Sequence, residues 1–144
     1  MKISMRGRYG VRLLIDLAEH LNEPHIPLSK VAERKRISIR YLEQVAVILR
    51  RTGFIRSVKG ASGGYALARA PEDIIIGEAL RNLEGDMLVL DPPLPGVSEN
   101  KLQRCVRLTV FDRLNDRIAA VIDRKTLASV VGTIDPDESY MYFI

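Results

Sequence analysis

Two short amphipathic segments joined by a tight connection constrain the fold of this chain more than any other feature. The first segment covers 28–36, with apolar residues on one face and lysine and arginine on the other. Ile37 forms the connection, and Ser38 is well placed to cap the second segment, which stops at Gly53. The apolar face of the second segment consists of Leu42, Val45, Ala46 and Leu49. Two short helices joined by a tight turn predict a helix-turn-helix.

The flanking residues predict another helix before this unit and a β-hairpin after it. Apolar residues spaced by three and four indicate a helix from 7 to about 22. The segments 54–58 and 65–67 are short and rich in aromatic and β-branched residues, as strands are, and the glycine-rich segment 59–64 joins them. A phosphate-binding loop is the competing interpretation of these glycines, but the sequence lacks the Gly-x-x-x-x-Gly-Lys-Ser/Thr motif. We therefore expect a hairpin.

A long helix is predicted near the C-terminus. Gly85 and the proline-rich segment 91–98 interrupt the helical pattern, which then resumes over about 24 residues, or roughly 36 Å. Because a helix of this length outreaches a small winged domain, we expect it to pair with its copy in a homodimer. Packing on its own domain is the alternative. The predicted interface stripe consists of Val110, Leu114, Ile118, Val121 and Ile122.

Together these elements predict a mainly α fold with a small β-hairpin wing. Residues 1–84 are expected to form a winged helix-turn-helix DNA-binding region, 85–100 a loop or hinge, and 101–144 a dimerisation helix and C-terminal tail. A chain of 144 residues, of which 47% are hydrophobic, is long enough for one modest core.

The distribution of charge favours a polyanionic ligand for the first half of the chain. The formal net charge is only +4, but residues 1–69 hold 14 Lys and Arg against 5 Asp and Glu, whereas residues 70–144 hold 8 against 13. A basic half joined to an acidic half is typical of a nucleic-acid surface attached to an assembly module. An ordinary solvated face is the alternative interpretation.

Several classes of protein are excluded or disfavoured. The single cysteine cannot form an internal disulfide, which favours a reducing, cytoplasmic location. No run approaches the ~18 apolar residues of a membrane span, and no catalytic or metal-binding signature occurs, so we expect neither a membrane protein nor an enzyme. Cys105, between Arg104 and Arg107, leaves a redox sensor open as an alternative.

The second helix of the helix-turn-helix carries the side chains that could read DNA. Recognition helices contact base edges from their N-terminal turns. Arg40 could donate to guanine or phosphate, Gln44 could pair with adenine, and Glu43 could accept from cytosine or pair within its own helix. The residues presented away from the apolar stripe are Ser38, Arg40, Tyr41, Glu43 and Gln44.

Further contacts to DNA are expected at the end of this helix and in the hairpin. Arg50 and Arg51 would serve phosphates. Lys59 would lie at a flanking minor groove, where Gly60 lets the backbone approach closely.

Three motifs resemble the bacterial winged helix-turn-helix regulators that include IscR, NsrR and CymR. They are Met1-Lys-Ile-Ser with Arg-Gly-Arg-Tyr at 6–9, then Ile-Ser at 37–38 with Tyr-Leu-Glu-Gln at 41–44, and Ser-Val-Lys-Gly-x-x-Gly-Gly-Tyr at 57–65. This resemblance implies a homodimeric repressor that binds double-stranded DNA at an imperfect palindrome. The N-terminal motif adds Lys2, Ser4, Arg8 and Tyr9 to the expected DNA contacts.

The resemblance also bears on sensing chemistry. Iron-sulfur members of the family hold a cluster with three cysteines in the segment that corresponds to 91–105, where this chain has one thiol. One thiolate cannot hold a cluster that needs about four protein ligands, so we expect no cofactor and no metal. The chain is most similar in this respect to the cluster-free cysteine-metabolism repressor, CymR, which implies a role in cysteine or sulfur metabolism.

The apolar C-terminal tail is predicted to bind a partner or to close the fold. CymR works with the cysteine-synthesising enzyme O-acetylserine thiol-lyase, and that enzyme family also captures a C-terminal isoleucine of another partner. The resemblance implies the same use of Tyr142, Phe143 and Ile144, whose terminal carboxylate and side chain would enter the enzyme. Two alternatives stay open: an adaptor that binds a metabolic enzyme through this tail, and an iron-sulfur or redox-sensing regulator.

Overall fold

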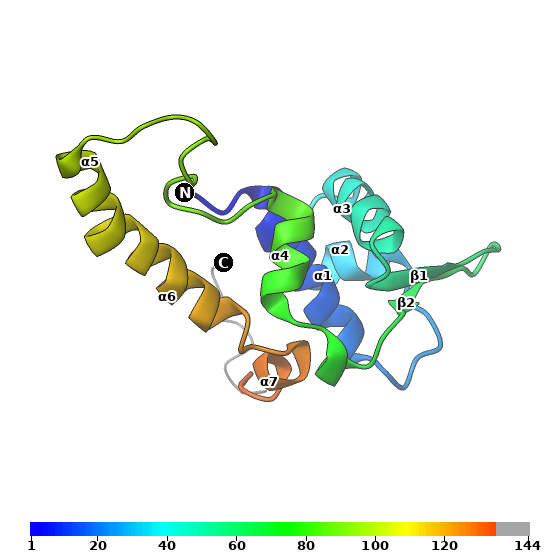
Figure 1. The fold of residues 1–144 in the computed structure, drawn as a ribbon. Helices are drawn as coiled ribbons and strands as arrows, with labels where there is room; N and C mark the ends of the chain where they lie inside the picture. Colours follow the sequence, from blue (N-terminus) through cyan, green and yellow to red (C-terminus); the bar gives the residue numbers. More distant parts are fainter. Residues whose placement is uncertain (135–144) are drawn as a thin grey trace.

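Helices form most of this computed structural model, which describes residues 1–134 (Figure 1). The α-helices are α1 (Met5–Glu19), α2 (Leu28–Lys35), α3 (Ile39–Arg51), α4 (Ile76–Glu84), α5 (Lys101–Val106), α6 (Asp112–Ile122) and α7 (Leu127–Val131). A single antiparallel hairpin consists of β1 (Ile55–Val58) and β2 (Gly64–Leu67). A short 3-10 helix covers Pro71–Asp73, and a π-helical segment covers Arg107–Phe111. The predicted mainly α fold with a small hairpin is confirmed.

The helix-turn-helix is formed by α2 and α3. Arg36 ends α2 in the left-handed conformation, with φ of 52°, and the buried Ile37 follows. The apolar face predicted for α3 is buried in full. Ser38 occupies the N-cap position as expected, but its side chain makes no capping hydrogen bond. Burial of the α3 stripe, rather than the cap, therefore anchors this helix.

The first helix is shorter at its C-terminal end than predicted. α1 ends at Glu19, before the polar turn that leads to Pro24, because the His20 ring hydrogen-bonds the Asp16 carbonyl and the His20 N–H donates to Leu17. Its buried residues pack against α3 and α4. Gly10 lies where a Cβ atom would collide with Leu83 of α4, so glycine allows these two helices to approach closely.

The wing is a two-stranded hairpin with an isolated β-bridge on its other edge. β1 and β2 pair with Ile55 opposite Leu67 and Val58 opposite Gly64. Ile26 adds to the other side of β2, with two 2.8 Å hydrogen bonds between its backbone and that of Tyr65. The tip turns at Gly60, whose φ of +123° favours glycine, and projects from the body of the molecule (Figure 1).

The long C-terminal helix is confirmed, and it contains an unpredicted π-helical segment. α5, the π segment and α6 form one continuous helix over 101–122, and none of its residues is buried. The helix lies at the opposite end of the molecule from α3 and the wing (Figure 1). Two sets of hydrogen bonds attach this helix to the rest of the chain. Asn115 of α6 accepts from the Val89 N–H (2.7 Å) and donates to the Leu90 carbonyl (3.1 Å). Asp123, the C-cap residue, accepts two hydrogen bonds from Arg81 of α4 at 2.6 and 2.9 Å.

After this helix the chain returns to the N-terminal core. Leu127 of α7 is fully buried, and its N–H donates to Ile74 (2.7 Å). The sequence did not indicate this return, because 101–144 reads as one helix and a tail. The tail with Tyr142, Phe143 and Ile144 lies outside the described residues. Within 1–134, no helix is long and apolar enough to cross a membrane.

Candidate nucleic-acid interface

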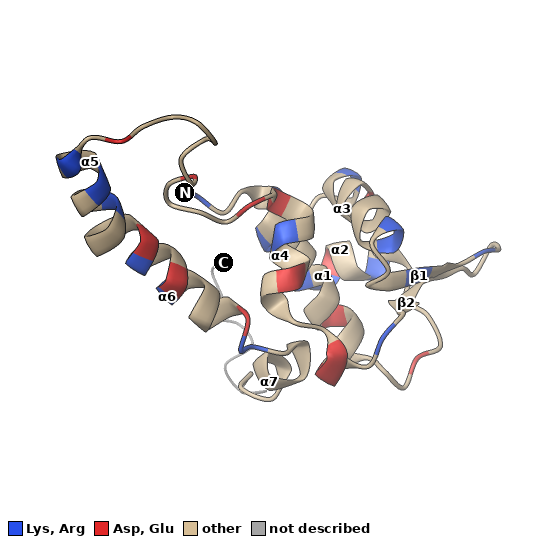
Figure 2. Cartoon of the chain, in the orientation of Figure 1, with Lys and Arg blue, Asp and Glu red and all other residues tan. Residues whose placement is uncertain are grey.

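The outward face of α3 presents polar side chains opposite its buried stripe. Arg40, Glu43 and Gln44 are all exposed, as the sequence predicts. The exposed Arg50 and Arg51 extend the basic surface to the C-terminal end of the helix. Figure 2 shows lysine and arginine on α3 and at the tip of the wing. Hydrogen-bonding groups in the first half of the helix, with cations at its C-terminal end, suit base contacts flanked by phosphate contacts.

Two tyrosines from different motifs meet at the start of α3. The rings of Tyr9 and Tyr41 lie 5.8 Å apart between centroids, edge to face at 86°. Arg12 lies over the Tyr9 ring at 5.8 Å and also donates a hydrogen bond to the Lys35 carbonyl at the end of α2. The sequence did not single out Arg12. These contacts tie α1 to both helices of the helix-turn-helix, and they hold Tyr41 in place.

Ser4 has a structural partner in addition to its predicted role at DNA. Its Oγ accepts a hydrogen bond from the Arg6 N–H (3.1 Å) and donates one to Glu84 Oε1 (2.6 Å), which also accepts from the Gly7 N–H (2.7 Å). Burial raises the pKa of Glu84, but the hydrogen bonds from Ser4 and Gly7 together outweigh it and leave the pKa below its usual value. The Glu84 carboxylate therefore joins the start of α1 to the end of α4. Lys2 and Arg8 are exposed nearby.

The wing places Lys59 and Gly60 at its exposed tip, where the sequence predicts them. The His25 ring hydrogen-bonds the Ser62 carbonyl, which connects the tip to the loop between α1 and α2. At the base, Arg69 lies over the Phe54 ring at 4.3 Å and donates to the Gly53 carbonyl (3.2 Å). These contacts fix the direction of the wing relative to the end of α3.

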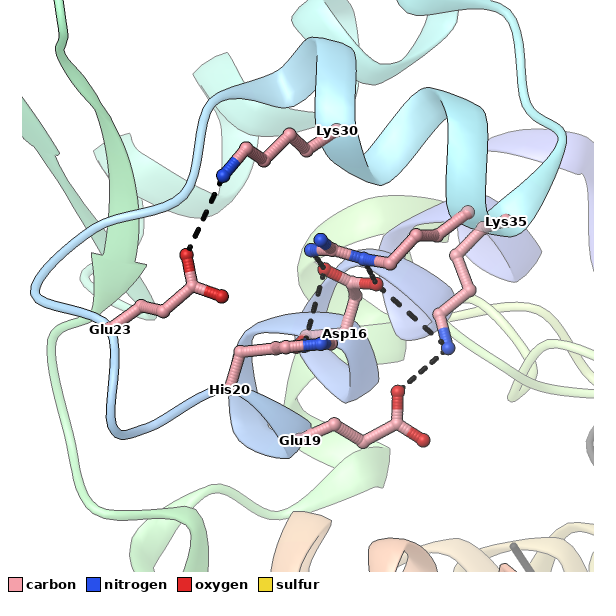
Figure 3. A network of polar contacts seen from close by, with 7 residues as sticks. Asp16, Glu19, His20, Glu23, Lys30 and Lys35 are labelled. Atoms are coloured by element: carbon pink, nitrogen blue, oxygen red, sulfur yellow. Dashed lines mark hydrogen bonds and ion pairs between the residues drawn. The ribbon is translucent and has the colours of Figure 1, made fainter.

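A buried carboxylate that the sequence analysis did not single out positions the helix-turn-helix (Figure 3). Asp16 of α1 has no exposed surface and accepts hydrogen bonds from Arg34 Nε (3.0 Å) and Nη2 (2.6 Å). The hydrogen bond to Asp16 raises the pKa of Arg34, and the smaller opposing effect of burial does not cancel it. Lys35 Nζ lies 3.9 Å from the same carboxylate and 2.7 Å from Glu19. The network therefore attaches α2 to α1.

Residues 3–133 match the model of the Rrf2 family, which is described as an iron-dependent transcriptional regulator. The chain belongs to the Rrf2 family. It is 34% identical to the HTH-type transcriptional regulator CymR of Bacillus subtilis, over the full length of both chains. This result confirms the resemblance that the three sequence motifs indicate.

Solved structures of similar regulators share the fold. The structure of CymR, the global cysteine regulator of B. subtilis, superposes with a TM-score of 0.81 at 32% identity, covering 94% of this chain and 99% of that one. IscR of T. potens superposes with a TM-score of 0.75 at 36% identity, covering 99% of this chain and 93% of that one. The winged helix-turn-helix assignment is thereby confirmed.

The family description names iron, but this chain lacks the protein ligands that an iron-sulfur cluster requires. The sequence has one cysteine, and Cys105 is exposed on α5. Within 1–134, the side chains close enough together to hold a metal ion are Asp16, Glu19 and His20. The two carboxylates of this group already form ion pairs with Arg34 and Lys35. Because a typical cluster needs about four protein ligands, mostly thiolates, these residues do not fit one.

The residues predicted for the dimer interface fall into two sets in the structure: four that are not packed on the core, and Ile122, which is. Val110 and Leu114 are each 45% exposed and Val121 is 62% exposed, while Ile118 is half-buried. Ile122 instead packs against the protein's own core beside Gly77 of α4. The first four residues are thus apolar groups on a helix with no buried residue, and Ile122 attaches that helix to the body.

Proposed function

We propose that this Rrf2-family protein is a homodimeric, sequence-specific DNA-binding repressor rather than an enzyme, and that it reads its operator with α3 and the wing. The observation that carries this proposal is the outward face of α3, where Arg40, Glu43 and Gln44 stand exposed above a fully buried apolar stripe. Lys59 extends the basic surface beyond the helix. This arrangement is the one by which helix-turn-helix proteins enter the major groove.

The dimer would form through the helix 101–122. Leu114 and its apolar neighbours need a partner surface, and a second copy supplies an identical one in a twofold arrangement. A twofold dimer presents two α3 helices to DNA, so the operator should be an imperfect palindrome. We assign 1–84 to DNA binding, 85–100 to the connection and the helix after it to dimerisation.

Binding-site selection with two variants tests the proposed readout. Glu43→Ala should change the selected consensus and leave the affinity for its own best site within a few-fold of wild type, because base contacts specify. Arg50→Ala should keep the consensus, lower affinity for all sequences and reduce the salt dependence by about one counterion per half-site, because phosphate contacts do not specify.

The matched control is Glu72→Ala, which removes an exposed carboxylate from the 3-10 helix, distant in sequence from α3. It should leave both consensus and affinity unchanged. An identical consensus for wild type and Glu43→Ala would show that Glu43 does not read a base.

We propose that the repressor works without an iron-sulfur cluster. Support comes from the single thiol at Cys105 and from the cations that already pair with Asp16 and Glu19. Protein purified anaerobically should hold no stoichiometric iron or acid-labile sulfide, and chelators should not change its DNA affinity. Stoichiometric iron, with absorbance between about 300 and 500 nm, would overturn this proposal.

We propose that the regulated genes belong to cysteine or sulfur metabolism and that residues 135–144 bind O-acetylserine thiol-lyase. The similarity to CymR and the apolar side chains Tyr142, Phe143 and Ile144 support this partner. Calorimetry of the purified enzyme with the full chain and with a variant lacking 142–144 tests it. Binding should be lost in the truncated chain and should weaken when O-acetylserine saturates the enzyme. Equal binding by both chains would exclude this role for the tail.

A further inference from the structure

One apolar side chain stands in the middle of the polar face of α3. The outward positions of this helix follow the spacing 40, 43, 44, 47 and 51, and four of them hold Arg, Glu, Gln and Arg. The fifth is Val47, whose side chain is 43% exposed. At 100° per residue, Val47 lies between Glu43 and Gln44 around the helix axis and one turn further along it.

Residues 1–134, the part of the chain that the structure describes, give no packing role to this valine. Residues Leu42, Val45, Ala46 and Leu49 make up the buried side of α3, and Val47 points away from them. The neighbouring Ile48 packs on the hydrophobic core of the described residues, whereas Val47 does not. A β-branched residue also has lower helix propensity than the alanine or lysine that would suit an exposed position. Val47 therefore contributes little to the stability of the fold.

An isolated apolar residue on a protein surface is ordinary, but this one lies on the face that enters the DNA groove. In the major groove, the 5-methyl group of thymine is the apolar feature that a base pair presents. The exposed side chains of Glu43, Gln44 and Arg51 surround Val47, so the apolar surface here is a single side chain and not the contiguous patch that marks a protein-binding site. The apolar partner that fits this position is therefore a thymine methyl group.

We propose that Val47 reads a thymine in each operator half-site by contact with its 5-methyl group. This inference rests on the proposed function and assigns one specificity contact to it. Uracil lacks this methyl group and keeps the same base pairing and the same O4 acceptor. Loss of one buried methyl contact corresponds to about a fourfold loss of affinity, so both half-sites together should lose about 15-fold.

The experiment uses the full-length protein and the palindromic duplex that it selects from random DNA. Each symmetric pair of thymines is replaced in turn by uracil, and the dissociation constant is measured for wild type and for Val47→Ser. At one symmetric pair, uracil should weaken the binding of the wild-type protein about 15-fold and the binding of the Val47→Ser protein less than twofold. Val47→Thr keeps one methyl group and should retain at least a threefold effect at the same pair.

The matched control is Ile39→Ala, which truncates another exposed apolar residue of α3. It should preserve the full uracil effect at the same pair. Wild-type binding that tolerates uracil at every position, or an equal loss in Val47→Ser, would overturn the assignment to Val47. Failure of the wild-type protein to select any DNA would instead overturn the proposed function, and the Val47 assignment would fail with it.

Discussion

Replacing Ile118 with aspartate should convert the protein to a monomer and lower its affinity for operator DNA at least about 100-fold. Ile118 lies on α6 between Leu114 and Val121, two exposed apolar residues on the same face of that helix. Twofold symmetry places each substitution in the interface twice, and an unpaired buried carboxylate costs several kcal/mol. Because each 1.4 kcal/mol is a factor of ten, dimer dissociation rises by about two orders of magnitude or more. Sedimentation velocity and operator titration measure the two effects.

Ala120→Asp is the matched control for this prediction. It introduces the same carboxylate on the same helix, two residues from Ile118 and therefore on the opposite side, at an exposed position. This variant should remain dimeric and bind DNA as wild type does. An Ile118→Asp protein that stays fully dimeric at micromolar concentration would show that the dimer uses another surface.

The parts of the fold that the sequence predicted well depend on contacts close in the chain. The buried face of α3 follows from apolar residues spaced by three and four, and the wing follows from two β-rich segments separated by glycines. The proposed base-reading residues Arg40, Glu43 and Gln44 are exposed because they occupy the other side of that same helix. Local periodicity carries this information without any knowledge of tertiary contacts.

The features that the sequence analysis missed depend on contacts between distant segments. The π-helical segment Arg107–Phe111 changes the helical phase, so a regular spacing across it does not define one face. Ile122 matches the apolar stripe by spacing, but it packs beside Gly77, forty-five residues earlier. α7 returns to the core through Leu127 and Ile74, and no local pattern marks that contact.

The position of Asp16 in the sequence is a signal that could have predicted its buried ion pair. It stands among apolar residues on the buried side of α1, between Ile15 and Leu17. A charged residue at such a position requires a partner, because a buried charge without one is costly. Its partner Arg34 reads as an ordinary solvated arginine of α2, and only the packing of α2 on α1 brings the two together.

Replacing Arg34 with methionine should lower the free energy of unfolding by about 3 kcal/mol. The substitution keeps an unbranched side chain along the stem of Arg34 but removes the guanidinium group and with it both hydrogen bonds to Asp16, whose carboxylate stays fully buried. Removing one partner of a buried ion pair costs about 3 to 5 kcal/mol. The lower value applies here because the side chain of Arg34 is 32% exposed and Lys35 Nζ lies 3.9 Å from the same carboxylate. Thermal unfolding should show a loss of about 10 °C.

Two further variants separate the loss of this ion pair from a general effect of removing an arginine. Arg40→Met changes an exposed arginine of α3 and should leave unfolding within about 0.5 kcal/mol of wild type. In the double variant Asp16→Leu with Arg34→Met, no buried charge is left without its partner, so stability should return to within about 1 kcal/mol of wild type.

The double variant has an apolar contact in place of two directed hydrogen bonds between α1 and α2, so it should bind operator DNA more weakly than wild type at equal stability. A double variant no more stable than Arg34→Met would mean that the single substitution acts through lost packing, and that the Asp16 carboxylate is not the source of the effect.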